Sequence, residues 1–415
     1  MPREPLPAAT TVSVVIPVRN GGADFTRLLS GLAAQQGLQD LEIVVVDSGS
    51  SDGSLDAARE HGARIIRIPP EEFSHSQSRN LGARHARGAS LLFMVQDALP
   101  PSDRWLSEIV DAMQAAGVSA LSCAESPRDD ADLFYRVSTW FHDRFMEIEG
   151  RDRIMFRPAG DDYRSVRKNA QLSNICCLIP RSLFLQYGFR GDFGEDLELG
   201  IRLIRDGHRL ALLGTKRIVH SHTRPPYYQL KRGYVDVRLL LHLFPDFSVP
   251  LIEVEDLLPD IVATFGVVDA TMQGELASLP TPCDPAALSD AVRAGLRHHA
   301  AGGAAVDRCI DSDLADPDFI AFLRSVDGRC ARHGAGPVLD AALFKGVSDG
   351  LGGVLEYLTD TGAVVDAALL EDFKACAYKT HAIQSGVHLA SAFARGSAMT
   401  KDKLRPIHAE LTRGI

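Results

Sequence analysis

Short apolar runs alternate with segments of helical periodicity through the first hundred residues, and this alternation constrains the fold most strongly. The apolar runs are rich in β-branched residues and predict strands over Thr11–Pro17, Leu41–Asp47, Arg64–Ile68 and Ser90–Val95. The segments between them predict helices over Ala23–Gln36, Ser50–His61 and Ser76–Ala86. Because the strands are almost continuously apolar and alternate with helices, we expect a mostly parallel sheet with helices on both faces.

The α/β pattern continues further along the chain and then changes. We expect, in order, a helix near Trp105–Ala116, strands near Val118–Ala124 and Asn174–Ile179, a helix over Glu195–Arg205, two short strands over Arg209–Leu213 and Arg217–His220, and a basic helix over Tyr227–Leu243. Beyond Pro259 the chain is rich in Ala and Leu and helical in period. We therefore predict a loose leader over 1–10, an α/β domain over 11–250 and a helical domain over 251–415.

Composition excludes several classes of protein. The formal net charge of −10 argues against general binding to nucleic acid, which usually needs a basic surface. The seven Cys residues form no CxxC pair, which favours reduced thiols and a cytoplasmic location. No apolar run approaches the roughly 20 residues that span a bilayer. Peripheral contact with the inner face of the cytoplasmic membrane stays compatible with the sequence.

Polar residues follow three of the predicted strands. Ligands of an open α/β sheet bind at the carboxyl ends of its strands, so these residues are candidates for a site. The chain has neither GxGxxG after the first strand nor GxxxxGK[ST], which argues against a dinucleotide fold and a P-loop. Asp47 ends the second strand and could accept hydrogen bonds from a nucleobase or a ribose. The alternative is helix capping, for which DSGSSDGS is well suited.

Several motifs together resemble family 2 inverting glycosyltransferases. They are VSVVIPVRNGG, EIVVVDSGSSDGS, RNLGARHARG and GEDLELGIRLIRDGH, and the resemblance covers roughly the first 240 residues. FSHSQSRNLGA, FMVQDALP and the late HSH resemble the rhamnosyltransferase-like branch, whose donors are typically dTDP-linked deoxysugars. The resemblance implies the Rossmann-like GT-A fold. It also implies sugar transfer from a nucleotide-diphosphate donor, such as dTDP-rhamnose or a UDP-sugar, to a glycan or lipid-linked acceptor in cell-surface polysaccharide synthesis.

The resemblance also implies which residues bind the nucleotide-sugar. The matching positions are Pro17, Arg19, Asp47, Ser48, Arg79, Asn80, Gln96 and Asp97. Arg79 and Asn80 match residues that close over the donor pyrophosphate, where a guanidinium suits bidentate phosphate recognition. The alternative for Arg79 is a solvated charge on a basic helix.

A divalent metal, Mn²⁺ or Mg²⁺, is expected at Asp97, which falls where the family has its DxD motif. The sequence departs from that motif, because Gln96-Asp97-Ala98 offers a single carboxylate. Further ligands are therefore needed, and His220 and His222 lie on the same side of an extended segment. We favour His222; the alternative is a polar loop in which neither imidazole binds metal.

Catalysis with inversion needs a carboxylate that deprotonates the acceptor hydroxyl. The resemblance places this base at Asp196, with Glu195 in support, whereas Glu198 should face elsewhere. Capping of the helix by these acids is the alternative. Trp140, Ser173 and Asn174 lie in the region that frames the acceptor, although core packing would also explain the tryptophan. The basic residues Lys216 and Arg217 could hold an anion or form a solvated face.

Two other functions stay open at this point. A sugar-phosphate nucleotidyltransferase also uses a Rossmann-like half and a metal, but it would want a Gly-rich basic loop that VRNGGAD does not provide. A degenerate glycan-assembly subunit without activity is suggested by the single Asp of the metal motif. The C-terminal region offers no motif, and homo-oligomerisation through it is compatible with the sequence.

Overall fold

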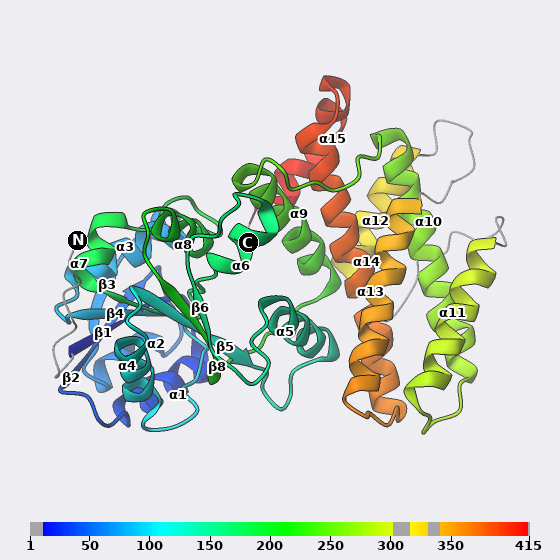
Figure 1. Cartoon of the computed structure of the whole chain (residues 1–415). Coiled ribbons are helices and arrows are strands. Elements are labelled where there is room, and N and C mark those ends of the chain that lie inside the picture. The colour runs from blue at the N-terminus through cyan, green and yellow to red at the C-terminus, as the bar shows by residue number, and fades with distance from the viewer. Residues whose placement is uncertain (1–10, 302–315, 331–340, 414–415) are drawn as a thin grey trace. The chain divides into compact units, whose positions relative to one another are not determined.

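The computed structural model describes residues 11–301, 316–330 and 341–413, and the predicted leader over 1–10 lies outside them. Contacts divide the chain into two compact units, Met1–Asp130 with Thr139–Ser221, and Ala131–Ser138 with His222–Ile415 (Figure 1). This division differs from the predicted boundary near residue 250. The basic helix that we assigned to the α/β domain packs instead against a C-terminal helix, so the change of unit comes about 30 residues earlier.

The first unit is built on one mixed sheet. Its strand order is β3-β2-β1-β4-β7-β5-β8-β6. The strands are β1 (Thr11–Val18), β2 (Asp40–Asp47), β3 (Arg64–Arg67), β4 (Ser90–Met94), β5 (Ala120–Ser126), β6 (Arg153–Met155), β7 (Cys176–Pro180) and β8 (Leu210–Val219). β1 pairs in parallel with β2 and β4, β2 with β3, and β5 with β8. β8 is one continuous strand where we predicted two short ones.

Two strands run against the others, and one of them shapes the site. β7 is antiparallel to both β4 and β5, and β6 is antiparallel to β8. The carboxyl ends of β1, β2, β3, β4, β5 and β8 therefore share one edge of the sheet, and β6 and β7 begin at that same edge. This edge is called the carboxyl edge below.

Helices cover both faces of this sheet, as predicted. The helices are α1 (Gly22–Ala33), α2 (Ser54–Glu60), α3 (His75–His85), α4 (Trp105–Ala116), the second half of α5 (Leu133–Met146), α6 (Tyr163–Asn169), α7 (Arg181–Tyr187) and α8 (Glu195–Arg205), with a 3-10 turn η1 (Pro70–Glu72). Apolar residues of α1 and α4 share one core with alternate residues of β1, such as Val14 and Ile16. α3 packs on the opposite face, where Gly82 approaches Val15. The continuous apolar run of β1 is thus explained, because its successive residues point to opposite faces of the sheet and pack against different helices.

The second unit is helical in the residues that the structure describes. Its helices are α9 (Pro226–Leu243), α10 (Val254–Gln273), α11 (Pro285–Ala301), α12 (Pro317–Cys330), α13 (Ala341–Asp360), α14 (Ala367–Arg395) and α15 (Ala398–Leu411), with η2 (Glu275–Ser278). α9 and α14 pack closely because Gly386 faces the backbone of α9: a Cβ there would lie 2.1 Å from the carbonyl oxygen of Leu230. Across the described ranges, we find no helix with the length and apolar character needed to cross a membrane.

Because α3 lies so close to the sheet, we predict that adding one methyl group at Gly82 lowers the stability of the protein. In Gly82→Ala the new Cβ would lie 2.4 Å from Cγ1 of Val15, so the helix must shift and the free energy of unfolding should fall by about 1–3 kcal/mol. Gly31→Ala in α1 is the matched control, because its Cβ would meet Pro100 at an ordinary 3.6 Å and should gain helix propensity. Chemical denaturation of both variants tests this, and equal effects would contradict the packing described.

Candidate active site

The loops that follow β1 and β2 are hydrogen-bonded to each other at the carboxyl edge. The N–H of Asn20 donates to Oγ of Ser50 at 3.0 Å, and Oδ1 of Asn20 accepts from the N–H of Ser51 at 2.8 Å. The N–H of Gly22 donates to a carboxylate oxygen of Asp52 at 2.9 Å. Asn20 has φ of 49°, a conformation that asparagine tolerates better than most residues. The two loops therefore form one surface.

Asp47 shapes the second of these loops. It ends β2, is 2% exposed, and accepts hydrogen bonds from the N–H groups of Gly49 at 3.2 Å and Ser50 at 3.1 Å. Ser48 donates its N–H to the carbonyl of Val18 at the end of β1. The carboxylate thus binds its own loop and does not cap α2, whose N-cap is Gly53, and each oxygen retains further acceptor capacity.

Gln96 joins the end of β1 to the loop after β4. Its Oε1 accepts from the backbone N–H of Arg19 at 2.9 Å. Pro17, one residue before the end of β1, lies in register with Val46 of β2. The structure therefore brings Pro17, Arg19, Asp47, Ser48, Gln96 and Asp97 to one edge, as the sequence predicted.

Asp97 and His220 come together from the ends of β4 and β8. Nε2 of His220 lies 3.7 Å from Oδ1 of Asp97, and its Nδ1 lies 3.0 Å from Oε2 of Glu125. One ligand atom each of Asp97, His220 and His222 lies within 4.8 Å of the others, a grouping that could hold a metal ion. The guanidinium of Arg128 donates to the carbonyl of Asp97 at 2.5 Å and to Asp24 of α1 at 2.9 Å, which fixes this loop.

Sequence reasoning missed Glu125. It lies at the carboxyl end of β5, so the rule that selected Asp47 and Asp97 would also have selected it. It was overlooked because that strand was expected to end at Ala124. Hydrogen bonding to a carboxylate through Nδ1 directs the other ring nitrogen of a histidine toward a ligand.

A buried ion pair joins α3 to α8. Nη1 of Arg79 lies 3.2 Å from Oε1 of Glu195, and the two side chains are 5% and 7% exposed. The same Oε1 accepts from Nδ2 of Asn174 at 2.8 Å. Burial, and then the neighbouring Asp196, raise the pKa of the Glu195 carboxyl, while Arg79 opposes that rise. Burial likewise lowers the pKa of Arg79.

Arg79 and Asn80 contact protein groups next to α8. Arg79 is 4% exposed and directed to Glu195, so its guanidinium is not a solvated surface charge. The amide of Asn80 exchanges two hydrogen bonds of 2.9 Å with the backbone of Phe189. Ser74 and Ser76 at the beginning of α3 bind Asp192 and the carbonyl of Gly191. Together, these side chains hold the loop before α8.

Asp196 is half-buried in the first turn of α8, directly after Gly194, whose φ is 62°. Its Oδ2 accepts from the N–H of Asn174 at 3.0 Å, and its Oδ1 accepts from the N–H of Leu197 at 2.8 Å. Glu198 points to another partner, as expected, and pairs with Arg202 at 2.7 Å. Asn174 thus contacts both carboxylates of the motif.

The residues expected around the acceptor have different environments. The N–H of Ser173 donates to Oγ of Ser122, and Asn174 supports the carboxylates from the segment directly before β7. Trp140 on α5 stacks edge-on against Phe141, which is 41% exposed, and lies 4.4 Å beneath the guanidinium carbon of Arg144. Lys216 and Arg217 are paired with Glu108 and Asp143, so neither is a free anion-binding cation.

Comparisons with known proteins find glycosyltransferases among the similar chains. Residues 13–176 match the profile of the family described as glycosyl transferase family 2. The O-antigen chain rhamnosyltransferase WbaN of Salmonella anatum is 24% identical over 226 residues, which cover 54% of this chain and 70% of that protein. A validoxylamine A glucosyltransferase of Streptomyces hygroscopicus subsp. jinggangensis is 39% identical over 236 residues, covering 49% and 54%. The mannosyltransferase PcManGT of Pyrobaculum calidifontis, solved with GDP-Man and Mn²⁺, has a TM-score of 0.46 at 20% identity and covers 80% of this chain and 90% of that one.

The motifs, the family match and the relatives all point to glycosyltransferases. Residues 13–176 of the chain are similar to family 2 of the glycosyltransferases, and O-antigen rhamnosyltransferases are among the relatives of the chain. The nucleotidyltransferase alternative is not favoured by any of these matches.

The buried pair predicts a pH-dependent loss of stability when Arg79 is removed. Arg79→Gln should destabilise the protein by about 3–5 kcal/mol near neutral pH, because Glu195 is left buried without its cation. An acid whose pKa is raised on folding costs stability as pH rises above its ordinary value. Loss of Arg79 raises that pKa further, so the deficit should be larger at about pH 8 than at about pH 5. Thermal melting at the two pH values measures it.

The double variant Arg79→Gln/Glu195→Gln is the control. Replacing the carboxylate should recover much of the stability and remove the extra pH dependence. An equal deficit for Arg79→Gln at both pH values would show that Glu195 is not the group responsible.

Proposed function

We propose that this protein transfers a sugar from a nucleotide-diphosphate donor to a saccharide acceptor with inversion, and that Asp196 is the general base. The observation that carries the proposal is the position of Asp196. The beginning of β7 holds it through Asn174, at the same sheet edge that carries Asp97 and His220. The rhamnosyltransferases among the relatives support a dTDP-linked or UDP-linked sugar as donor and a glycan or lipid-linked acceptor.

The nucleoside end of the donor is assigned to the surface formed by the first two loops. Arg19 is exposed there, and its guanidinium, which makes no ion pair with the described residues, is assigned to the diphosphate, while Gln96 holds its backbone. Asp47 fixes the turn that follows β2 and retains lone pairs for a nucleobase or ribose donor. We assign Arg79 and Asn80 to holding the loop before α8 instead of to the pyrophosphate.

A divalent ion is assigned to Asp97, His220 and His222, and the donor set fits it. One carboxylate and two imidazoles suit Mn²⁺ better than Mg²⁺, which takes oxygen ligands almost alone. When bound, such an ion would neutralise charge on the leaving diphosphate. In this assignment Nδ1 of His220 carries the proton and donates a hydrogen bond to Glu125. Nε2 is then unprotonated, and its lone pair is directed toward Asp97 and the ion.

Asp196 is suited to receive the proton of the acceptor hydroxyl. Each of its oxygens accepts one protein N–H, so acceptor capacity remains for a substrate hydroxyl. The two hydrogen bonds fix the rotamer of the carboxylate, and orientation of the reacting groups supplies much of such catalysis. Glu195 is buried against Arg79 and acts by holding Asn174, which makes it a positioning residue.

Replacing the base should remove turnover and leave donor binding intact. Asp196→Asn should lower kcat by about 10²–10⁴-fold, because a positioned carboxylate contributes that much to proton transfer. Donor affinity should change little, since the substitution is nearly isosteric and distant from the nucleotide loops. Kinetics with dTDP-rhamnose and UDP-sugars, with calorimetry of nucleotide binding, measure both quantities.

Glu198→Gln is the matched control, because this carboxylate is on the same helix and pairs with Arg202. It should keep normal kcat. Near-normal turnover of Asp196→Asn would place the base elsewhere. Absence of transfer by the unmodified protein with every donor would support the non-catalytic assembly role.

Removing the carboxylate behind His220 should weaken metal binding. Glu125→Gln should reduce Mn²⁺ affinity by about 10–100-fold, as loss of such a hydrogen-bond partner typically does. Titration of Mn²⁺ followed by electron paramagnetic resonance measures the affinity without any substrate. Glu108→Gln, which removes a carboxylate paired with Lys216, is the control and should leave the affinity unchanged. Unaltered binding in Glu125→Gln would argue against His220 as a ligand.

A further inference from the structure

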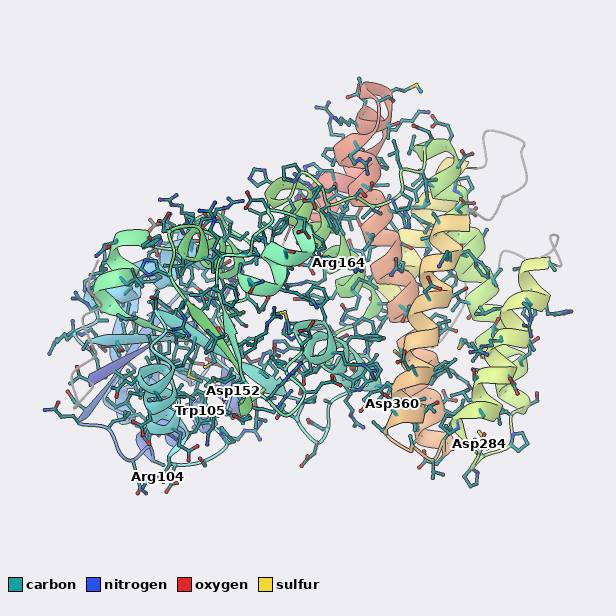
Figure 2. The ribbon with its side chains drawn as sticks, in the orientation of Figure 1. Arg104, Trp105, Asp152, Arg164, Asp284 and Asp360 are labelled. Atoms are coloured by element: carbon teal, nitrogen blue, oxygen red, sulfur yellow. The ribbon has the colours of Figure 1, made fainter. Side chains whose placement is uncertain are left out.

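A basic hollow lies beside α6 in the first unit and belongs to none of the groups described so far. It measures about 340 Å³ and is lined by Phe145, Arg153, Arg164, Ser165, Lys168 and Asn169. Three of these lining side chains are cationic and none is a carboxylate. Figure 2 labels Arg164 on α6. In a chain whose net charge is −10, such a concentration of positive charge at a concave surface calls for an explanation.

The cations of this hollow are not neutralised equally. Lys168 pairs with Glu147 at 2.6 Å and lies 5.3 Å from the ring centre of Phe145. Arg153 donates one hydrogen bond, from Nη1 to the carbonyl of Met146 at 3.0 Å. Arg164 is exposed, and its guanidinium makes no hydrogen bond or ion pair within the described ranges. The hollow thus presents one uncompensated guanidinium, a second with unused donors, and an ammonium whose counterion is itself half exposed.

The acidic groups near the hollow are already engaged. Glu147 binds Lys168, and Asp162 accepts from the N–H of Ser165 at 3.0 Å as the cap of α6. The amide of Asn169 is likewise used, since it donates to the carbonyl of Ser165 and accepts from the N–H of Phe156. An incoming anion would therefore meet the cations and not these polar groups.

The chain connects this hollow to the base. α6 packs against α8, and the contact is close: a Cβ on Gly200 would lie 1.9 Å from the carbonyl oxygen of Ala170, the residue after α6. Four residues further on, Asn174 binds both Glu195 and Asp196. The hollow is thus on the segment that leads to the base. The metal group and the nucleotide loops are built from other residues.

We propose that this hollow binds a phosphate group carried by the acceptor. The inference rests on the proposed function, because it names the class of acceptor for the same reaction. Guanidinium groups bind phosphate oxygens in a bidentate manner, and a doubly charged phosphate suits more than one cation. The ring of Phe145 provides an apolar wall next to the charges, which suits the non-ionic part of a phosphate ester.

Direct binding of phosphate tests the site without catalysis. In the presence of EDTA, which removes the metal from the donor site, calorimetric titration with glycerol 3-phosphate should show binding to the unmodified protein. Arg164→Gln should weaken it by about 10–100-fold, the effect of losing one charge-assisted hydrogen-bonding partner. Arg157→Gln is the matched control: it removes an exposed arginine of the same segment that does not line the hollow, and should leave binding unchanged.

A second probe distinguishes the sources of the phosphate. Flotation with phosphatidylcholine vesicles containing phosphatidic acid, against vesicles of phosphatidylcholine alone, reports binding to a lipid phosphate. Loss of flotation in Arg164→Glu but not in Arg157→Glu would support a lipid-linked acceptor. Binding of glycerol 3-phosphate without flotation would support a water-soluble one.

The outcomes separate this proposal from the proposed function. Failure of the unmodified protein to bind either probe, or equal binding by Arg164→Gln, overturns the phosphate site and leaves the role of Asp196 untouched. Loss of phosphate binding in Arg164→Gln together with normal turnover of Asp196→Asn would keep the site and reject the base. Since Arg164 is exposed, melting temperatures of its variants should equal that of the unmodified protein.

Discussion

The buried pair of Arg79 and Glu195 is the interaction on which the arrangement of the catalytic side depends. It joins α3, which is pressed against the sheet through Gly82, to α8, which carries the candidate base. Two charges removed from water are costly unless each is paired and hydrogen-bonded, and Asn174 supplies the additional bond here. The pair therefore holds the first turn of α8 against α3, and the bond from Asn174 to Glu195 joins that turn to the segment before β7.

The reversed direction of β7 explains why so few residues are needed to assemble the site. A parallel strand in this position would begin at the opposite edge, and Asn174 could not reach the carboxylates of α8. Because β7 runs against β4 and β5, its first residues stand beside the last residues of its neighbours. The groups assigned to the donor and the groups assigned to the acceptor thus meet at the carboxyl edge.

The sequence permitted prediction of the sheet, its covering helices and the gathering of Asp47, Gln96 and Asp97, because strand ends are set by local pattern. It did not permit prediction of the partners of Arg79, since whether a helical arginine faces solvent or a buried acid depends on packing between distant helices. Glu125 was missed because the predicted end of β5 was two residues too early. The division of the chain at Ser221 also depends on long-range contacts. The composition of α9 does not indicate which of the two units the helix packs in.

The pairing of β5 with β8 contains an irregularity that sets the direction of His220. Cys123 is opposite Leu213 and Glu125 is opposite Ile218, so β8 advances five residues while β5 advances two. Leu213 and Ile218 nevertheless enter the same core, although an odd spacing would normally place them on opposite faces. The extra residues of β8 thus bring Ile218 to the same face of the sheet as Leu213. They also set the side of the strand on which His220, two residues after Ile218, lies. In the evolution of such a chain, insertions or deletions of two residues within 214–217 would preserve the side on which the imidazole emerges, whereas single-residue changes would turn it away from Glu125.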